Sequence, residues 1–420
     1  MRRRLGPSCA LLLLQLTSCR EVAEVLRADT GAGGASSAAG APSGSDAGDA
    51  ATGGARPLDP RLGIFVDSGD AHGCATRYGG LYCWGAGADG RLGLGDTEDR
   101  NVPTRVGVDA DWVTVATGVA HSCALKTDGR VWCFGANTFG QLGQGSTESS
   151  SVPVLVQLPG EVRQLSSEAN TACAVLVSGE LYCWGRNWEG NIGLDDTHPG
   201  VDQLWPVRSG DGSDWKLTGT GDGHTCAVRE PGLLFGWGRN TAANLGLGQT
   251  RDQQRRVATR IGDDDDWQLV VSGQDSSCGI RAAGELFCWG GNSFGNLGLG
   301  DTAQRLVPTQ VEAAQPERVW QQVAIDTFHG CGIDSETNLY CWGRGLEGQL
   351  GTSDDDEHLL PALVAPGFAQ VAAGRMSSCA VSVGGAVLCA GENDAGQLGV
   401  GDSERRPTFT ELTFPDARAP

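Results

Sequence analysis

A unit of about fifty residues recurs along the chain, and this repetition constrains the fold more than any other feature. Successive units begin 48 to 53 residues apart, counted at the first cysteine of each unit: Cys74, Cys123, Cys173, Cys226, Cys278, Cys331 and Cys379. Repetition this regular is typical of a solenoid or a propeller, in which each unit buries apolar surface against its neighbours. We expect the seven units to form one domain over residues 61–415.

Each unit contains a hairpin whose register can be derived from its turn. In the second unit residues 127–129 form a three-residue loop, and Gly129 supplies the positive φ that such loops need at their third position. This register places Cys123 opposite Cys133 in a non-hydrogen-bonded pair, where Cα atoms lie about 4.5 Å apart and a disulfide fits. The same loop position is occupied in five other units by Gly179, Gly232, Gly284, Gly385 and, unexpectedly, Thr337.

The same register predicts six cross-strand disulfides. The pairs are Cys74 with Cys83, Cys123 with Cys133, Cys173 with Cys183, Cys278 with Cys288, Cys331 with Cys341 and Cys379 with Cys389. In the fourth unit Gly236 replaces the second cysteine, so Cys226 is predicted to be a free thiol and a small apolar core residue. A reactive thiol or an intermolecular disulfide is the alternative for Cys226. Zinc ligands need closer spacing, so we expect no metal site.

Both faces of each hairpin are apolar. In the second unit an aliphatic pair, Leu125 and Val131, shares one face with the cysteines, and the opposite face pairs Ala124 with Trp132. A hairpin that is apolar on both faces must lie between neighbouring sheets, as propeller blades do. The predicted fold class is therefore all-β, a seven-bladed β-propeller preceded by a disordered tether.

The segment after the second cysteine repeats as a tip motif, such as WGRNWEGNIGLD after Cys183 and WGGNSFGNLGLG after Cys288. With the strand before it, this pattern resembles the repeat of the regulator of chromosome condensation family. The resemblance covers all seven units and implies a seven-bladed β-propeller. It also raises guanine nucleotide exchange on a small GTPase as an alternative function. The exchange factor of the family resembles a propeller with an extra hairpin, for which the even spacing of these units leaves no room.

The first residues have the features of an export signal. Three arginines precede a short apolar run that ends in LTSC, which resembles a bacterial lipobox. The run is too short to span a bilayer, so residues 1–18 are predicted to be a lipoprotein signal peptide, with lipid attached to Cys19. An ordinary signal peptide with a chance cysteine is the alternative.

Residues 19–60 are rich in Gly, Ala and Ser and have little to bury, so we expect a flexible, lipid-anchored linker. Residues 416–420 form a short tail after the propeller. Disulfides persist outside the reducing cytosol, in agreement with export. The predicted location is the cell envelope, at the outer membrane or the cell surface.

Charge and motifs exclude several functions. The formal net charge of −20 has the wrong sign for binding nucleic acid or anionic lipid headgroups. Acidic clusters at residues 263–266 and 354–357 lack the spacing of a calcium loop and are predicted to be solvated turns. No catalytic triad, phosphate loop or carboxylate dyad stands out. We therefore expect no enzyme and no cofactor, with a propeller hydrolase as the alternative.

Histidines recur two residues before a cysteine, which suggests a metal ring on the axis of the propeller. They are His72, His121, His224 and His329, and Thr171, Ser276 and Ser377 replace them in the other units. This replacement favours a hydrogen bond within each blade over a metal site.

Variable apolar side chains at the tips are the remaining functional candidates: Phe139, Trp188, Phe294 and Leu346. Such side chains on a rigid scaffold suit partner recognition, and packing against a neighbouring tip is the alternative. We predict a monomeric, non-enzymatic propeller that binds an unidentified protein or cell-surface component. Its ring is predicted to close by strand pairing, with residues 408–414 joining the sheet that holds residues 64–67, because this removes two exposed edges.

Overall fold

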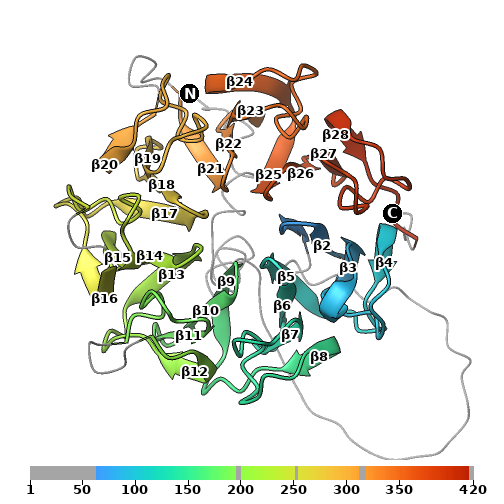
Figure 1. The fold of residues 1–420 in the computed structure, drawn as a ribbon, viewed down its shortest axis with the longest axis horizontal. Helices are drawn as coiled ribbons and strands as arrows, with labels where there is room; N and C mark the ends of the chain where they lie inside the picture. Colours follow the sequence, from blue (N-terminus) through green and yellow to red (C-terminus); the bar gives the residue numbers. More distant parts are fainter. Residues whose placement is uncertain (1–62, 195–199, 251–253, 312–317, 416–420) are drawn as a thin grey trace, which may run out of the picture. The chain divides into compact units, whose positions relative to one another are not determined.

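The computed structural model describes residues 63–194, 200–250, 254–311 and 318–415. Strands β1 to β28 in these ranges form seven antiparallel sheets of four strands each. The sheets surround a central axis as the blades of a seven-bladed β-propeller, which confirms the predicted fold class (Figure 1). The predicted signal peptide, Cys19, the linker and the tail lie outside the described residues. Within the described ranges, no helix has the length and apolar character needed to cross a membrane.

Each blade is a meander of four consecutive strands, and we number the blades 1 to 7 in chain order. Blades 1 and 2 contain β1 Ile64–Ser68, β2 His72–Arg77, β3 Gly80–Gly85, β4 Arg100–Arg105, β5 Trp112–Thr117, β6 His121–Lys126, β7 Val131–Gly135 and β8 Ser150–Leu155. Blades 3 and 4 contain β9 Val162–Glu168, β10 Thr171–Leu176, β11 Leu181–Gly185, β12 Gln203–Arg208, β13 Trp215–Thr220, β14 His224–Arg229, β15 Leu233–Arg239 and β16 Gln254–Arg260.

Blade 5 contains β17 Trp267–Ser272, β18 Ser276–Arg281, β19 Leu286–Gly290 and β20 Arg305–Gln310. Blades 6 and 7 contain β21 Trp320–Ile325, β22 His329–Asp334, β23 Asn338–Gly343, β24 His358–Pro366, β25 Phe368–Ala373, β26 Ser377–Ser382, β27 Val387–Gly391 and β28 Arg406–Glu411. The first strand of each blade lies next to the central channel and the fourth lies at the outer rim (Figure 1).

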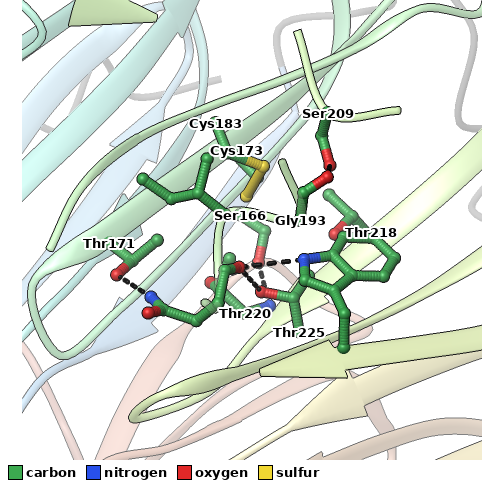
Figure 2. Close-up of a disulfide and its surroundings, with 12 residues drawn as sticks. Ser166, Thr171, Cys173, Cys183, Gly193, Ser209, Thr218, Thr220 and Thr225 are labelled. Atoms are coloured by element: carbon green, nitrogen blue, oxygen red, sulfur yellow. Dashed lines mark hydrogen bonds between the residues drawn. A yellow bond between two sulfur atoms is a disulfide. The ribbon is translucent and has the colours of Figure 1, made fainter. Parts of the chain in front are cut away.

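The hairpin between the second and third strands has the predicted register. In blade 2, Cys123 is opposite Cys133 and Leu125 is opposite Val131. The structure has a disulfide at each of the six predicted cysteine pairs, with Cα atoms 4.0 to 4.1 Å apart. Figure 2 shows the bridge between Cys173 and Cys183 in blade 3. Every bridged cysteine is 0% exposed, so the disulfides lie inside the interfaces between blades.

Most hairpin loops contain the expected glycine with positive φ. The φ angles are 77° at Gly129, 85° at Gly179, 79° at Gly284 and 82° at Gly385. The prediction for Gly232 was wrong, because Gly232 is absent from the residues with positive φ. Pro231 precedes it and fixes its own φ near −65°, so this loop turns differently.

Thr337 adopts the positive φ that glycine supplies in the related loops, with φ of 66°. The carboxylate of the nearby Asp334 accepts the backbone N–H groups of Glu336 and Asn338, each at 2.9 Å. The backbone N–H of Thr337 also donates to the carbonyl of Asp334 at 3.0 Å. The local hydrogen bonds of one aspartate therefore hold a conformation that a β-branched residue disfavours.

Blade 4 lacks the disulfide, and its core is filled by another side chain. Cys226 is free and buried, and burial raises the pKa of its thiol to about 11. A Cβ atom added at Gly236, the residue opposite, would lie 2.9 Å from Cδ1 of Ile261. Val106 and Val156 occupy the position of Ile261 in the bridged blades 1 and 2. The extra methylene of the isoleucine thus occupies space that the missing cysteine side chain would need.

A buried tryptophan joins neighbouring blades. In blade 3 the indole N–H of Trp184 donates to the backbone carbonyl of Gln141, in the tip loop of blade 2, at 2.9 Å. Four other tryptophans make the same bond to the preceding blade at 2.8 or 2.9 Å: Trp84, Trp237, Trp289 and Trp342. These indoles are 0% exposed, so a lost bond would leave a buried polar group unsatisfied.

The recurring histidines also join neighbouring blades, so the prediction of a hydrogen bond within each blade was wrong for them. At the same position in blades 3 and 5 the prediction was right, because the hydroxyl of Thr171 donates to the carbonyl of Arg186 at 3.0 Å and that of Ser276 accepts from the amide of Asn296 at 3.2 Å. The second strand faces the next blade, which brings each histidine Nε2 within 2.7 to 3.0 Å of a serine Oγ there. The pairs are His72 with Ser122, His121 with Ser167, His224 with Ser277 and His329 with Ser378. Burial lowers the pKa of these histidines to about 3 or 4, so the rings are neutral at pH 7.

The ring closes without exchanging strands, and the predicted pairing of the two ends was wrong. Strand β28 pairs with β27, whereas β1 pairs with β2. Blades 7 and 1 use the contacts that join other blades, including the bond from the Trp84 indole to the carbonyl of Gln397 at 2.8 Å. Phe414 then packs edge-to-face against Tyr82, with ring centroids 5.2 Å apart. Side-chain packing between blades is thus sufficient to close the ring.

The environment of Gly236 predicts how a seventh disulfide can be introduced. We expect Gly236→Cys alone to be strained, because its Cβ would contact Ile261 at 2.9 Å, and the double variant with Ile261→Val to form the bridge with Cys226. Alkylation of the denatured, unreduced propeller followed by intact-mass measurement should show one labelled thiol fewer than in the wild type. A labelled Cys226 in the folded double variant would contradict this account of blade 4.

Candidate functional site

The propeller has two faces that differ in their loops. One face, which we call the tip face, carries the loops after the first and third strands of each blade. The other, the hairpin face, carries the hairpin loops and the connections between blades. The antiparallel order of the strands requires this division. All four candidate residues from the sequence, Phe139, Trp188, Phe294 and Leu346, belong to loops of the tip face.

Phe139 and Trp188 form a pair between the tips of blades 2 and 3. Their rings meet edge-to-face with centroids 5.3 Å apart, and the guanidinium of Arg186 lies 4.6 Å from the ring of Trp188. Trp188 is nevertheless 52% exposed. The two interpretations of these side chains are therefore compatible, since the rings pack on each other and still present apolar surface to solvent.

A second aromatic pair lies three blades further around the ring. Phe294, in the tip loop of blade 5, packs against Phe328 of blade 6 with ring centroids 4.8 Å apart. The guanidinium of Arg344 lies 5.1 Å from the ring of Phe328. Leu346, in the tip loop of blade 6, is 48% exposed. The structure thus forms two separate aromatic patches, one of Phe139 with Trp188 and one of Phe294 with Phe328.

A polar cavity of about 190 Å³ lies at the mouth of the channel on the tip face. Loops after the first strand of all seven blades contribute to its lining. The lining residues are Asp70, Val119, Glu168, Ala169, Asn170, Arg186, Asp222, Gln274, Asp326, Thr327 and Arg375. Sequence reasoning missed this site, in which residues from every blade meet.

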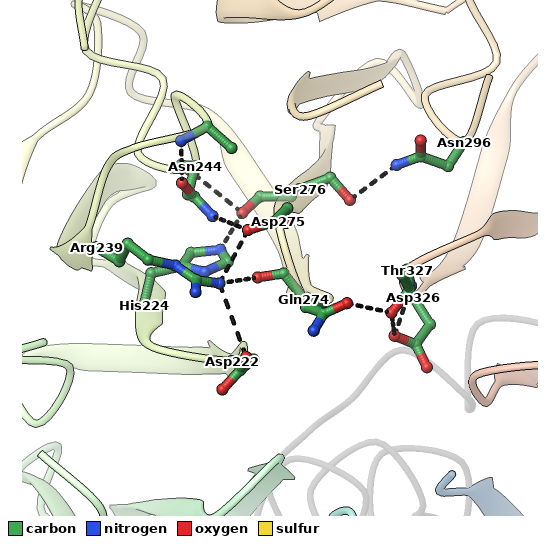
Figure 3. Close-up of polar contacts among 12 residues, drawn as sticks. Asp222, His224, Arg239, Asn244, Gln274, Asp275, Ser276, Asn296, Asp326 and Thr327 are labelled. Carbon is green, nitrogen blue, oxygen red and sulfur yellow. Dashed lines mark hydrogen bonds and ion pairs between the residues drawn. The ribbon is translucent and has the colours of Figure 1, made fainter. Parts of the chain in front are cut away.

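The carboxylates at the mouth differ in their partners. Arg375 lies 3.6 Å from Asp70, and Arg186 lies 3.2 Å from Asp222. Asp326 instead accepts hydrogen bonds at Oδ1, from the backbone N–H and the hydroxyl of Thr327 (Figure 3). Among the described residues, neither Asp326 nor Glu168 has an ion-pair partner within 4.0 Å.

Burial and mutual repulsion raise the pKa of three carboxylates at the mouth, those of Asp70, Glu168 and Asp326. Burial and, after it, the negative charge of Asp70 raise the pKa of Asp326 to about 6. Burial also raises the pKa of Glu168, with the charge of Asp326 as the next cause. The pKa of Asp70 is raised by burial despite the opposing charge of Arg375. The fold therefore holds negative charge here at a cost in stability.

The sequence contains a signal that could have found the two unpaired carboxylates. Five residues before the first cysteine, five units have a glycine: Gly69, Gly118, Gly221, Gly273 and Gly374. The other two units have Glu168 and Asp326 at this position. Backbone crowds the glycines, so that a Cβ at Gly221 would lie 2.4 Å from the carbonyl oxygen of Gly273. Replacement of this glycine by a carboxylate in two units is therefore the sequence signal that could have identified the site.

The remaining sequence candidates have structural roles. Asp264 and Asp266 form ion pairs with Arg281 on the hairpin face, and Asp355 forms one with Arg405. Within the described ranges, no group of three or more His, Cys, Asp or Glu side chains could hold a metal ion. The seven sheets account for all described strands, so this part of the chain contains no extra hairpin.

The fold is a repeat propeller of seven four-stranded blades. A repeated tip motif joins its blades, and loops of every blade surround a polar cavity at one end of the channel. A family model for the RCC1-like domain matches residues 80–418. The chain is also 32% identical over 367 residues to the ultraviolet-B receptor UVR8 of Arabidopsis thaliana, which covers 85% of this chain and 71% of the receptor. The chain therefore belongs to the RCC1-like domain family.

Other relatives share parts of the chain or the fold. The mitochondrial RCC1 domain-containing protein RUG3 of Arabidopsis thaliana is 31% identical over 230 residues, which is 50% of each protein. The structure of Kap60 bound to yeast RCC1 (Prp20) matches with a TM-score of 0.72 and 21% identity, over 88% of this chain and 91% of that chain. Prp20p from Saccharomyces cerevisiae matches with a TM-score of 0.70 and 22% identity, over 84% and 88%.

The buried carboxylate of Asp326 predicts a stability change with a defined pH dependence. Its pKa rises on folding, so the native state binds more protons and loses stability as pH increases from about 4 through 6. Asp326→Asn should therefore raise the free energy of unfolding by about 3 kcal/mol at pH 7.5, since each pKa unit corresponds to about 1.4 kcal/mol. The gain should vanish at pH 4. Denaturant titration at both values measures it.

Asp263→Asn is the matched control, because Asp263 is exposed on the hairpin face and the substitution removes the same charge. We expect this variant to change the free energy of unfolding by less than about 0.5 kcal/mol at either pH. An equal gain at pH 4 and pH 7.5 for Asp326→Asn would show that the effect does not come from ionisation.

Proposed function

We propose that this protein is a non-enzymatic, protein-binding propeller that engages its partner with the tip face. The observation that carries the proposal is the composition of that face, where two aromatic patches lie around a mouth that holds negative charge. Exposed aromatic side chains beside buried polar groups are typical of the centre of a binding interface. The negative net charge favours a partner with a basic surface.

The comparisons support protein binding in general. The Prp20p structure is described together with its binding to Gsp1p and histones, so a propeller with this fold serves as a scaffold for protein partners. One fold serves many functions, so the partner of this chain must be derived from its own surface. The aromatic residues at the tips and the carboxylates of Glu168 and Asp326 vary from unit to unit. They are therefore the part of the surface that the fold of the repeat does not require.

We further propose that the propeller works outside the reducing cytosol as a monomer, lipid-anchored at Cys19 through residues 19–60. The six disulfides support an oxidising location, because such bridges are rare in reducing compartments. The first described strand, β1, begins at the hairpin face and runs to the loop that contains Asp70 on the tip face.

Substitution of Trp188 tests the proposed binding face, and Trp205 supplies a matched control. Both indoles are 52% exposed, but Trp205 lies on the outer strand β12 instead of a tip loop. Trp188→Ala should weaken binding of the partner at least about tenfold, as expected when a large interface residue is truncated. Trp205→Ala should leave binding within about twofold.

The measurement is quantitative cross-linking and recovery from the envelope of the producing cells, followed by titration with the recovered partner. Equal loss of binding with both variants, each shown by thermal unfolding to be folded, would show that the tip loop has no special role, and a loss confined to Trp205→Ala would move the interface to the rim. Either result would contradict the proposed face.

The proposed anchor has its own test. Cys19→Ser removes the sulfur to which lipid would be attached, so the variant should appear in the aqueous phase after detergent partition, whereas the wild type enters the detergent phase. Mass spectrometry of the amino-terminal peptide measures the modification directly. Wild-type protein without lipid, or a variant that still enters the detergent phase, would contradict lipid anchoring at Cys19.

A further inference from the structure

The charges around the channel mouth do not balance. Four carboxylates line the cavity with two guanidinium groups. Arg375 and Arg186 are engaged by Asp70 and Asp222, as the distances of 3.6 and 3.2 Å show. The remaining two carboxylates, those of Glu168 and Asp326, have no cationic partner in the part of the chain that the structure describes. One further positive charge would neutralise part of this excess.

The two unpaired carboxylates have free acceptor capacity. Asp326 is only 5% exposed, yet its Oδ2 has no hydrogen-bond partner among the described residues, because both bonds from Thr327 reach Oδ1 (Figure 3). Within the described ranges, the one hydrogen bond to the carboxylate of Glu168 comes from the backbone N–H of Ala169. Both carboxylates line an open cavity, so a cationic donor brought by a ligand can form a charge-assisted hydrogen bond with each of them.

Both carboxylates replace a glycine of the repeat, so they are not needed to build the blade. The interfaces of the other blades form with a glycine at this position, as at Gly118 and Gly273. Their side chains instead reach the cavity from blades 3 and 6, on different sides of the mouth. Two independent departures from the repeat thus lead to the same cavity.

The residues that line the cavity favour an organic cation over a metal ion. A metal ion is disfavoured, since no described group of three His, Cys, Asp or Glu side chains converges closely enough to coordinate one. Val119 and Ala169 add an apolar wall that suits methylene groups. A volume of about 190 Å³ accepts the end of one side chain, but it is too small for a folded segment.

An ammonium group suits the available oxygens better than a guanidinium does. A guanidinium forms its strongest contacts with both oxygens of one carboxylate, and Thr327 already occupies one oxygen of Asp326. An ammonium is a compact charge with three donors, which can be shared between single oxygens of different carboxylates.

We propose that the channel mouth is a binding site for a primary alkylammonium group, supplied by a lysine side chain of the partner protein and held between Glu168 and Asp326. The inference rests on the proposed function for the source of the lysine, but the site itself can be tested without the partner. The methylenes of the lysine lie against Val119 and Ala169, and its ammonium donates to Oδ2 of Asp326 and to the carboxylate of Glu168.

The test is a titration of the full-length protein with short capped peptides, followed by ligand-observed NMR. The probes are acetyl-Gly-Lys-Gly-amide, its norleucine analogue, which lacks only the ammonium, and its arginine analogue. Cadaverine represents a free amine. We expect the lysine peptide to bind at least tenfold more tightly than each of the other three. Glu168→Gln and Asp326→Asn should each weaken its binding at least tenfold, whereas Asp263→Asn should not.

Each other outcome overturns the proposal. Equal binding of the norleucine peptide, or no binding of the lysine peptide, removes the ammonium site. Tighter binding of the arginine peptide assigns the mouth to a guanidinium, and equal binding of cadaverine assigns it to free amines. Thermal unfolding of both variants shows that they are folded. The result is independent of the Trp188→Ala comparison, so the failure of this inference and the failure of the proposed function can be distinguished.

Discussion

The hydrogen bond from a buried indole to the tip loop of the preceding blade is the contact on which the rest of the propeller depends. It joins the third strand of one blade to the tip loop that follows the third strand of the preceding blade. Trp184 on β11, for example, donates to Gln141 in the loop after β7. Because the bond is internal to the interface, each of the five blades with this tryptophan orders a tip loop of the blade before it. In blades 2 and 7, Phe134 and Ala390 stand in place of the tryptophan, and packing and the histidine–serine bonds maintain those interfaces.

This arrangement separates stability from function along each repeat. Residues in the middle of the blades are fixed by burial on both sides. The loops after the third strands are held at fewer points: by glycines, by the indole bonds and by a buried asparagine such as Asn137, which donates to the carbonyl of Glu148 and accepts from the backbone N–H of Leu142. Side chains such as Trp188 and Asp326 can therefore vary without loss of the blade. The raised pKa of Asp326 shows that one of these variations destabilises the folded state, which is typical of residues retained for binding.

Contacts within a blade were predictable from the sequence, and contacts between blades were not. The alternation of side chains along a strand fixes the pairing of Cys123 with Cys133 once the loop is known. No comparable rule says that His72 reaches Ser122 of the next blade, or that Phe414 closes the ring against Tyr82. The channel mouth was missed for the same reason, since Glu168 and Asp326 are 158 positions apart in the sequence and only the circular arrangement brings them to one cavity.

The disulfides have a consequence for how the chain matures. Each bridge closes a hairpin over only 9 or 10 residues, so both cysteines of a pair emerge together during synthesis. The nearest wrong partner is tens of residues away, and loop-closure entropy disfavours that pairing by about 1 kcal/mol. Oxidation can therefore proceed blade by blade in the order of synthesis, with little need for later disulfide isomerisation. Cys226 emerges without a partner in its hairpin, and its burial in blade 4 keeps it out of exchange with bridges already formed.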